Sequence, residues 1–148
     1  MFSDGPERLL VFRMGAERFA LTLAAVDEVV DTPVIQPLPD AAAGALGLAT
    51  IRDELVAIFD PSPILRVKAE SPGAVLLFQR GGRRIGLAID DVYDAITVEK
   101  DELRNVPGSE ASDGSLLGVV RRGTDLIGVL DADALLDATT AVSEGGRT

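Results

Sequence analysis

The chain has 148 residues, 47% of them hydrophobic, and a formal net charge of −10, so it is long and apolar enough to bury a core. It contains no cysteine and no histidine, which excludes disulfides, thiolate chemistry and the commonest general base and metal ligand. The acidic charge disfavours nucleic acids and anionic lipids as partners and favours proteins.

Targeting and membrane-spanning segments are not expected. The first eight residues lack the basic and apolar regions of a signal peptide. The longest uncharged apolar run, over residues 41–51, is shorter than the roughly 20 residues that span a bilayer. The sequence therefore predicts a cytoplasmic protein that does not insert into a membrane.

The first predicted elements are a β-hairpin and a short helix. Residues 9–12 are apolar, residues 18–23 alternate with the period of two that is typical of a strand, and Gly15 between them permits a tight turn. A helix is expected over residues 24–31, because Val26, Val29 and Val30 have the i, i+3, i+4 spacing of one helical face.

A second hairpin is predicted from residues 46–51 and 55–59, with its turn at Asp53 and Glu54. The sequence then repeats. A shift of 66 residues superimposes 9–31 on 75–97, and a shift of 71 superimposes 45–65 on 116–136. The identical pairs include Leu10 with Leu76, Phe12 with Phe78, Gly15 with Gly81, Arg18 with Arg84, Gly47 with Gly118, Leu55 with Leu126 and Asp60 with Asp131.

The second copy predicts the same elements in the same order. They are a hairpin of 75–78 with 84–89, a short helix over 90–97 with Asp90 as its N-cap, and a hairpin of 117–120 with 126–130 that turns at Gly123 and Thr124. A last helix is expected over 133–138, followed by a polar tail at 143–148.

The predicted fold class is mainly β, with two SH3-like five-stranded antiparallel barrels related by the internal repeat, and short helices. Each half, about 8–70 and about 71–136, is too small to be comfortably stable alone. We therefore expect a single domain over residues 8–142, in which the halves share an apolar seam and can intertwine at their ends.

Three segments resemble the CheW-like chemotaxis coupling proteins. LVFRMG at residues 10–15 resembles the F-x-L-G start of that family, VDEV at 26–29 resembles its V-x-E-V/I motif, and GLATIRD at 47–53 resembles its G-V-x-N-L-R-G hairpin. The chain departs from the family at Thr50, usually Asn, at Asp53, usually Gly, and at Pro61, which follows Asp60 where Leu and Arg are usual.

The resemblance implies an adaptor without catalytic residues, cofactor or metal. It would link the cytoplasmic tips of chemoreceptors to the regulatory domain of a chemotaxis-type histidine kinase, at receptor arrays on the inner membrane. The implied kinase-binding residues are Leu23, Val26, Glu28 and Val29, and the implied receptor-binding residues, in a groove between the barrels, are Leu48, Arg52, Val92 and Ala95.

The three valines, Glu28 and Arg52 among the implied site residues also have a purely structural interpretation. The valines are typical of a buried face, Glu28 of a solvated charge, and Arg52 of an exposed pair with a neighbouring acid, which contributes only about 0–1 kcal/mol. Within the family, a coupling protein of a pilus or gliding motility pathway is an alternative.

A different class of protein is also compatible with the arginines near the hairpin ends. A double SH3-like barrel that binds RNA would use Arg80, Arg83, Arg84, Arg121 and Arg122. No aromatic residues are interleaved with them to stack bases, which favours a solvated rim.

Aspartates suggest two further sites that the sequence disfavours. Asp60 ends an apolar strand, as the phosphoacceptor of a receiver domain does, but the acidic pair that such a domain needs is missing. Asp131, Asp133 and Asp137 lack the glycine and glutamate of an EF-hand loop. Helix capping is the favoured explanation for Asp131.

Overall fold

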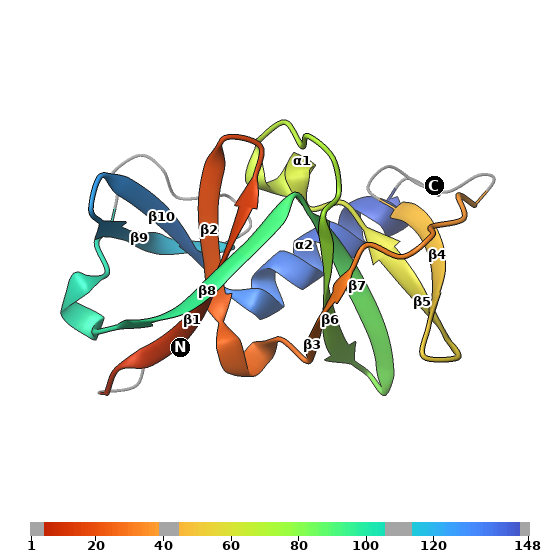
Figure 1. Cartoon of the computed structure of the whole chain (residues 1–148), viewed down its shortest axis with the longest axis horizontal. Helices are drawn as coiled ribbons and strands as arrows, with labels where there is room; N and C mark the ends of the chain where they lie inside the picture. Colours follow the sequence, from red (N-terminus) through yellow and green to blue (C-terminus); the bar gives the residue numbers. More distant parts are fainter. Residues whose placement is uncertain (1–4, 39–44, 106–113, 146–148) are drawn as a thin grey trace.

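Each copy of the repeat contains five strands followed by a helix (Figure 1), whereas its 3₁₀ turn follows the second strand in the first copy and the third strand in the second. The structure is a computed structural model that describes residues 5–38, 45–105 and 114–145, with side chains up to residue 140. The first copy contains β1 (Glu7–Met14), β2 (Glu17–Thr22), the 3₁₀ turn η1 (Leu23–Ala25), β3 (Glu28–Asp31), β4 (Ala45–Ile51), β5 (Glu54–Phe59) and α1 (Ser62–Leu65). The second contains β6 (Ala74–Arg80), β7 (Arg83–Ile89), β8 (Asp91–Val98), η2 (Lys100–Glu102), β9 (Leu116–Arg122), β10 (Asp125–Leu130) and α2 (Ala132–Gly145).

The strands form two five-stranded sheets, which confirms the predicted mainly β fold with two five-stranded units, although each sheet contains one parallel pair where the prediction has antiparallel pairs only. Sheet A has the order β8-β1-β2-β10-β9, and sheet B has the order β3-β6-β7-β5-β4. Each copy therefore places its first hairpin in the sheet that holds the last strands of the other copy. The hairpins join their new sheets through parallel pairs, β2 with β10 and β5 with β7, whereas the other pairs are antiparallel.

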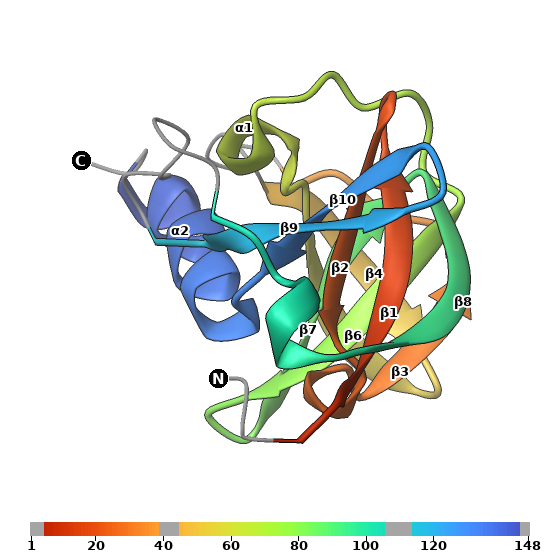
Figure 2. The ribbon, with the colours of Figure 1, turned by 90° about the vertical axis from the view of Figure 1, so that its left-hand side faces the viewer.

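Three apolar clusters fill the molecule, and β1 contributes to two of them. Leu9 and Val11 belong to a cluster formed by residues of sheet A and the segment after β8. Leu10, Phe12 and Met14 belong to a second cluster, to which both sheets contribute and which we call the seam. The interior of sheet B holds the third cluster, which includes Val75 and Leu77 of β6. α2 packs on one side of the seam, and β3 and β8 lie on the other side (Figure 2). The alternation of a strand thus supplies two cores at once.

Each sheet also bends back toward its far edge. The segment after β3 reaches the opposite edge strand β4 through an isolated bridge between Gln36 and Leu48, and the segment after β8 reaches β9 through Arg104 and Val119. Gly47 and Gly118 precede the residues bridged on the edge strands, with φ of 147° and 158°. A Cβ at Gly47 would lie 2.1 Å from the carbonyl oxygen of Gln36, so the close approach requires glycine.

Gly47→Ala is expected to lower the free energy of unfolding by at least about 2 kcal/mol, because backbone strain and overpacking each cost about 1–3 kcal/mol. Gly123→Ala is the matched control, since Gly123 also has a positive φ of 62° but no atom within 4 Å of an added Cβ. Urea unfolding of both variants measures the difference. Equal losses would show that the bridge does not require the glycine.

The helices predicted over 24–31 and 90–97 are wrong, because the first region holds the end of η1 and then the strand β3, and the second is almost entirely the strand β8. Leu10 of β1 pairs with Ala95 of β8 and Phe12 pairs with Val92, so that between these pairs one residue of β1 faces two residues of β8. This β-bulge inserts one extra residue, so that Val92 and Ala95 lie on one face although they are three apart. The spacing therefore imitates the period of a helix.

The prediction that Asp90 is an N-cap is wrong. Asp90 is a buried hydrogen-bond acceptor. Its side chain is 2% exposed, and its Oδ2 accepts the N–H of Gly15 at 2.6 Å and that of Glu70 at 2.9 Å. Arg13 lies 3.9 Å away, and its hydrogen bond with Glu70 raises the pKa of the guanidinium. Asp90 thereby ties the β1–β2 turn to the segment that joins the two copies.

Smaller corrections concern turns and the last helix. The β4–β5 turn lies at Arg52 and Asp53, both with positive φ, one residue earlier than predicted. The last helix, α2, is longer than the predicted 133–138 and takes in residues 143–145 of the predicted tail, while 146–148 lie outside the described residues. No helix in the described part of the chain is long and apolar enough to cross a membrane.

One aspartate follows β5 and another follows β10, and each accepts a backbone N–H at the start of the next helix. Asp60 accepts the N–H of Ser62 at 2.9 Å. Asp131 accepts that of Asp133 at 3.0 Å, which confirms the capping interpretation of Asp131. The equivalence of these two contacts follows from the internal repeat.

Candidate partner-binding site

A group of charged side chains joins β3, the β4–β5 hairpin and β7 on sheet B. Arg52, at the hairpin turn, pairs with Glu28 at the start of β3. Arg84 of β7 lies 2.9 Å from Asp27, 3.6 Å from Glu28 and 3.8 Å from Glu54. We call these five residues the charge cluster. Its members come from both copies of the repeat, so the exchange of hairpins between the sheets assembles it.

The structure places two of the implied kinase-binding residues near solvent and two against the seam. Leu23 and Val26 are partly buried and pack on the seam, which for Val26 agrees with its interpretation as core. Val29 of the edge strand β3 is 38% exposed, and the adjacent Glu28 belongs to the charge cluster. Val29 and Glu28 are thus the two of these four that a partner reaches most directly.

The implied receptor-binding residues fall in two places. Leu48 and Arg52 lie on β4 and its turn, at one end of the molecule, whereas Val92 and Ala95 lie on β8, which crosses the other half (Figure 1). Arg52 pairs with Glu28, which is an implied kinase-binding residue, and not with an acid next to it in the sequence.

Two residues of each implied site are related by the repeat. The shift of 66 residues that superimposes 9–31 on 75–97 places Val26 on Val92 and Val29 on Ala95. Val29 and Ala95 therefore occupy corresponding positions on the edge strands β3 and β8, while Val26 precedes β3.

Leu48 borders a groove of about 600 Å³ on sheet B. Its apolar residues come from β4, β5 and β7, and its polar residues include Glu54 and Arg84 of the charge cluster. Leu55, at the start of β5, also borders it and is 69% exposed. An apolar groove with charges beside it suits a docked protein segment.

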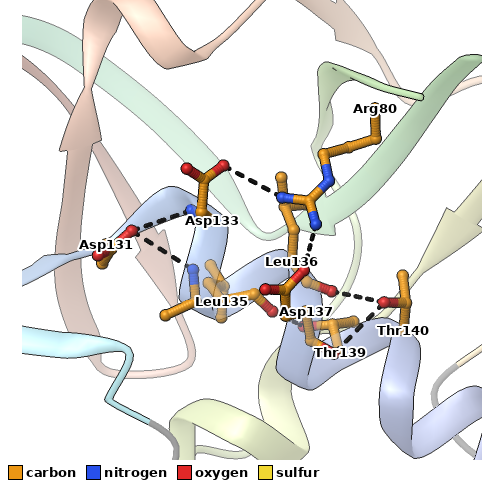
Figure 3. A network of polar contacts seen from close by, with 9 residues as sticks. Arg80, Asp131, Asp133, Leu135, Leu136, Asp137, Thr139 and Thr140 are labelled. Atoms are coloured by element: carbon orange, nitrogen blue, oxygen red, sulfur yellow. Dashed lines mark hydrogen bonds and ion pairs between the residues drawn. The ribbon is translucent and has the colours of Figure 1, made fainter. Parts of the chain in front are cut away.

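A second concave surface, of about 400 Å³, lies where η1, β6 and α2 meet, and Val26 borders it. Arg80 of β6 reaches across this surface to α2 and pairs with Asp133 at 3.1 Å and with Asp137 (Figure 3). These ion pairs fix the first turns of α2 against β6, beside the implied kinase-binding residues.

Arginines that the RNA-binding alternative requires are used within the molecule. Arg80 pairs with α2, Arg84 belongs to the charge cluster, and Arg122 pairs with Glu102 and donates to the carbonyl oxygen of Thr97. Three of the five arginines are therefore neutralised by neighbours. This arrangement disfavours a basic surface for nucleic acid.

The ion pair of Arg122 gives the chain a pH-dependent contact. A hydrogen bond from the Glu99 N–H, 2.9 Å long, and the Arg122 guanidinium lower the pKa of Glu102 below its ordinary value of 4.5. A carboxyl whose pKa is lower in the folded state than in the unfolded state makes its full contribution to stability at a pH above its unfolded pKa. This contribution is lost as the pH falls through the folded pKa.

Glu102→Gln is therefore expected to lower the Tm at pH 7, with the Tm values of variant and wild type converging as the pH falls below 4.5. Thermal unfolding followed by circular dichroism across this pH range measures the difference. A Tm difference that stays constant across the range contradicts the assigned role of the carboxylate.

Sequence reasoning missed three members of the charge cluster. The sequence assigns no role to Asp27, expects Glu54 only as a turn residue or a partner of Arg52, and groups Arg84 with the arginines of the RNA-binding alternative. A signal for Arg84 was present, because the internal repeat matches it to Arg18. Arg18 makes equivalent contacts on sheet A, with Asp125 at 3.2 Å and with the ring of Tyr93 at 4.7 Å from its centroid.

The fold and this surface define a duplicated β protein whose grooves and exposed charges suit contact with other proteins. The chain belongs to the CheW-like domain family, whose model matches residues 8–140, and is a chemotaxis protein of the CheW type.

Relatives in several bacteria support this membership. The chain is 31% identical to a chemotaxis protein CheW of Rhizobium meliloti (strain 1021) over 108 residues, which cover 71% of this chain and 70% of the relative. It is 24% identical to a chemotaxis protein CheW of Treponema pallidum (strain Nichols) over 145 residues, 92% of this chain and 85% of the relative. The crystal structure of the scaffolding protein TtCheW from Thermoanaerobacter tengcongensis has the same fold, with a TM-score of 0.71 at 19% identity, covering 84% of this chain and 88% of that one.

Proposed function

We propose that this chain is a non-enzymatic adaptor that couples chemoreceptors to a chemotaxis-type histidine kinase. Its partners are the cytoplasmic tip of the receptors and the regulatory domain of the kinase, and it works in the cytoplasm at receptor arrays on the inner membrane. The names of its relatives, chemotaxis proteins and a scaffolding protein, support the pathway.

One observation carries the proposal to particular residues. Arg52 is the arginine of the segment that resembles the family's hairpin motif, and its side chain is 68% exposed at the tip of the β4–β5 hairpin. A guanidinium presented on a turn forms charge-assisted hydrogen bonds with carboxylates or carbonyl oxygens of a docked segment. We assign Arg52 and Leu48 to the receptor contact on sheet B, with the groove beside them.

Val92 and Ala95 belong to the same proposal but to another part of the surface. Both lie on the edge strand β8, on the face that the bulge turns toward the seam. The receptor contact then extends from sheet B to sheet A, and we assign Val92 and Ala95 to its part on sheet A.

The kinase contact is assigned to Leu23, Val26, Glu28 and Val29. Val29 makes the sharpest probe of this assignment, because it is exposed on an edge strand while Val26 packs on the seam. Val29→Asp is expected to weaken binding of the kinase regulatory domain about tenfold or more, because the carboxylate would be desolvated at an apolar contact. Its Tm is expected to stay close to that of the wild type.

Val34→Asp is the matched control for Val29→Asp, since Val34 is 84% exposed and has no assigned role. Titration calorimetry with the isolated regulatory domain measures both affinities. Equal affinities of the two variants would remove Val29 from the kinase contact.

Co-purification tests the function as a whole. The chain is expected to co-purify with a chemotaxis-type histidine kinase from the same organism and to lose the kinase when its regulatory domain is deleted. Retention of the truncated kinase, or failure to retain the intact one, contradicts the proposal. The same experiment with a kinase of a pilus or gliding motility pathway identifies the pathway.

A further inference from the structure

We propose that Arg84 is a positioning residue for the partner contact. It holds the Glu28 carboxylate in place, so that the Arg52 guanidinium can leave Glu28 and bind a carboxylate of the docked partner. This inference rests on the proposed function and adds the chemistry of the partner, which must bring an acidic side chain to the β4–β5 turn.

Glu28 is shared between two arginines through different oxygen atoms. Its Oε2 faces Nη2 of Arg52, while its Oε1 lies 3.6 Å from Nη1 of Arg84. Because the two cations use different oxygens, departure of one leaves the other ion pair intact. Glu28 therefore does not become an unpaired carboxylate when Arg52 moves away.

The two arginines differ in how firmly they are held. Arg84 lies on β7, its side chain is 22% exposed, and three carboxylates surround it. Arg52 lies on a turn, is 68% exposed, and has Glu28 as its single ion-pair partner among the described residues. An exposed ion pair is weak because water screens it and the side chains lose freedom. Arg52 is therefore the member of the cluster that exchanges.

The charge balance of the cluster makes Arg84 necessary for that exchange. Asp27, Glu28 and Glu54 carry three negative charges, against two positive charges from Arg52 and Arg84. Without Arg84, Arg52 would be the single cation beside this acidic group and would be held there more strongly. Loss of Arg84 is thus expected to weaken partner binding through Arg52, without any contact between Arg84 and the partner.

The internal repeat supplies a matched control. Arg18 corresponds to Arg84, Asp125 to Glu54 and Tyr93 to Asp27. Arg18 contacts Asp125 and the Tyr93 ring in the way that Arg84 contacts its acids. Glu28 corresponds to Asp94, which makes no ion pair among the described residues, so sheet A has no equivalent of the shared carboxylate. Arg18→Gln removes the same structural contact without touching an exchangeable arginine.

The positioning role is tested in the free protein by a crystal structure of Arg52→Gln. The Glu28 carboxylate is expected to stay beside Arg84 when its other partner is removed. A Glu28 side chain that turns to solvent in this variant overturns the proposal, whatever the partners turn out to be.

The exchange is tested by titration with the kinase regulatory domain and with a soluble fragment of a chemoreceptor tip. Arg84→Gln is expected to weaken binding of the chemoreceptor-tip fragment, the partner assigned to Arg52, about five- to tenfold in the wild-type background but less than about twofold in the Arg52→Gln background. Arg18→Gln is expected to change the affinity less than about twofold. Equal losses in the two backgrounds, no loss from Arg84→Gln, or a similar loss from Arg18→Gln overturns the exchange.

Failure of the proposed function has a different signature. If the wild type binds neither probe, the adaptor role fails, and the structure of Arg52→Gln still decides whether Arg84 positions Glu28. Arg84→Lys gives a second check in the free protein and in binding. A lysine is a point cation that cannot face three carboxylates as a guanidinium does, so this variant is expected to fall between wild type and Arg84→Gln.

Discussion

Arg52→Glu is expected to abolish measurable binding of a chemoreceptor-tip fragment while the protein stays folded. Charge-assisted hydrogen bonds contribute about 1.5–3 kcal/mol, which corresponds to about 10- to 150-fold in affinity. Arg52→Ala removes this attraction. Arg52→Glu also adds repulsion, because the new carboxylate faces Glu28 and the carboxylate of the partner, so it is expected to have the larger effect.

The fold is expected to tolerate both substitutions at Arg52. The Arg52 side chain is exposed. The backbone at this position has a φ of 51°, which strains Ala and Glu no more than Arg, because all three residues carry a Cβ. The control for charge alone is Arg8→Glu, which makes the same change of charge at an exposed residue of β1. If Arg52→Glu binds the receptor fragment as tightly as Arg8→Glu does, the receptor contact lies elsewhere.

A charge exchange separates the internal ion pair from the partner contact. Glu28→Arg combined with Arg52→Glu restores an ion pair within the cluster but reverses its direction. The double variant is expected to regain any Tm lost by Arg52→Glu without regaining receptor binding. Recovery of both would mean that Arg52 serves the fold by holding Glu28 and does not contact the receptor.

The sequence predicts the hairpins well because they are local. In β2 and β7 the larger apolar residues alternate along the sequence, which predicts a strand, although consecutive residues of both strands are buried because both faces are covered. Their turns need residues that adopt positive φ, such as Gly15 and Gly81. Both signals lie within a few residues of each other, so no knowledge of distant parts of the chain is needed.

The exchange of hairpins between the sheets could not be predicted in the same way. Pairing of β1 with β8 joins residues about 80–90 positions apart, for example Arg13 with Asp91 and Glu7 with Val98. Apolar alternation shows which face of a strand is buried but not which distant strand lies beside it. The bulge in β8 has the same origin, since only the register against β1 reveals the extra residue.

The candidate site could likewise be predicted only in part, in some of its residues but not in their contacts. The resemblance singled out Glu28 and Arg52 as separate contacts, but their ion pair depends on the register of β3 and on the β4–β5 turn. Arg84 enters the cluster because β6 and β7 come from the second copy and join sheet B. Its role rests on tertiary pairing that a single sequence does not encode locally.

Phe12→Ala is expected to lower the free energy of unfolding by about 3–5 kcal/mol and to leave one unfolding transition. Phe12 is 1% exposed in the seam, with its ring centroid 5.9 Å from that of Phe19. Such a loss is a large part of the about 5–15 kcal/mol that stabilises a typical domain. Because β1 packs in sheet A and faces the seam with residues of β6 and β7, damage at Phe12 is expected to weaken both sheets together.

Phe78 corresponds to Phe12 in the repeat and is also 1% exposed in the seam, so Phe78→Ala is expected to give a similar loss. Phe12→Leu, at a smaller cost, keeps the test open if the alanine variant does not fold. The surface control is Leu126→Ala, expected within about 0.5 kcal/mol of the wild type because Leu126 is exposed. Calorimetry that resolved two transitions, in the wild type or in either phenylalanine variant, would show that the halves unfold independently and that the seam does not unite residues 8–142 into one domain.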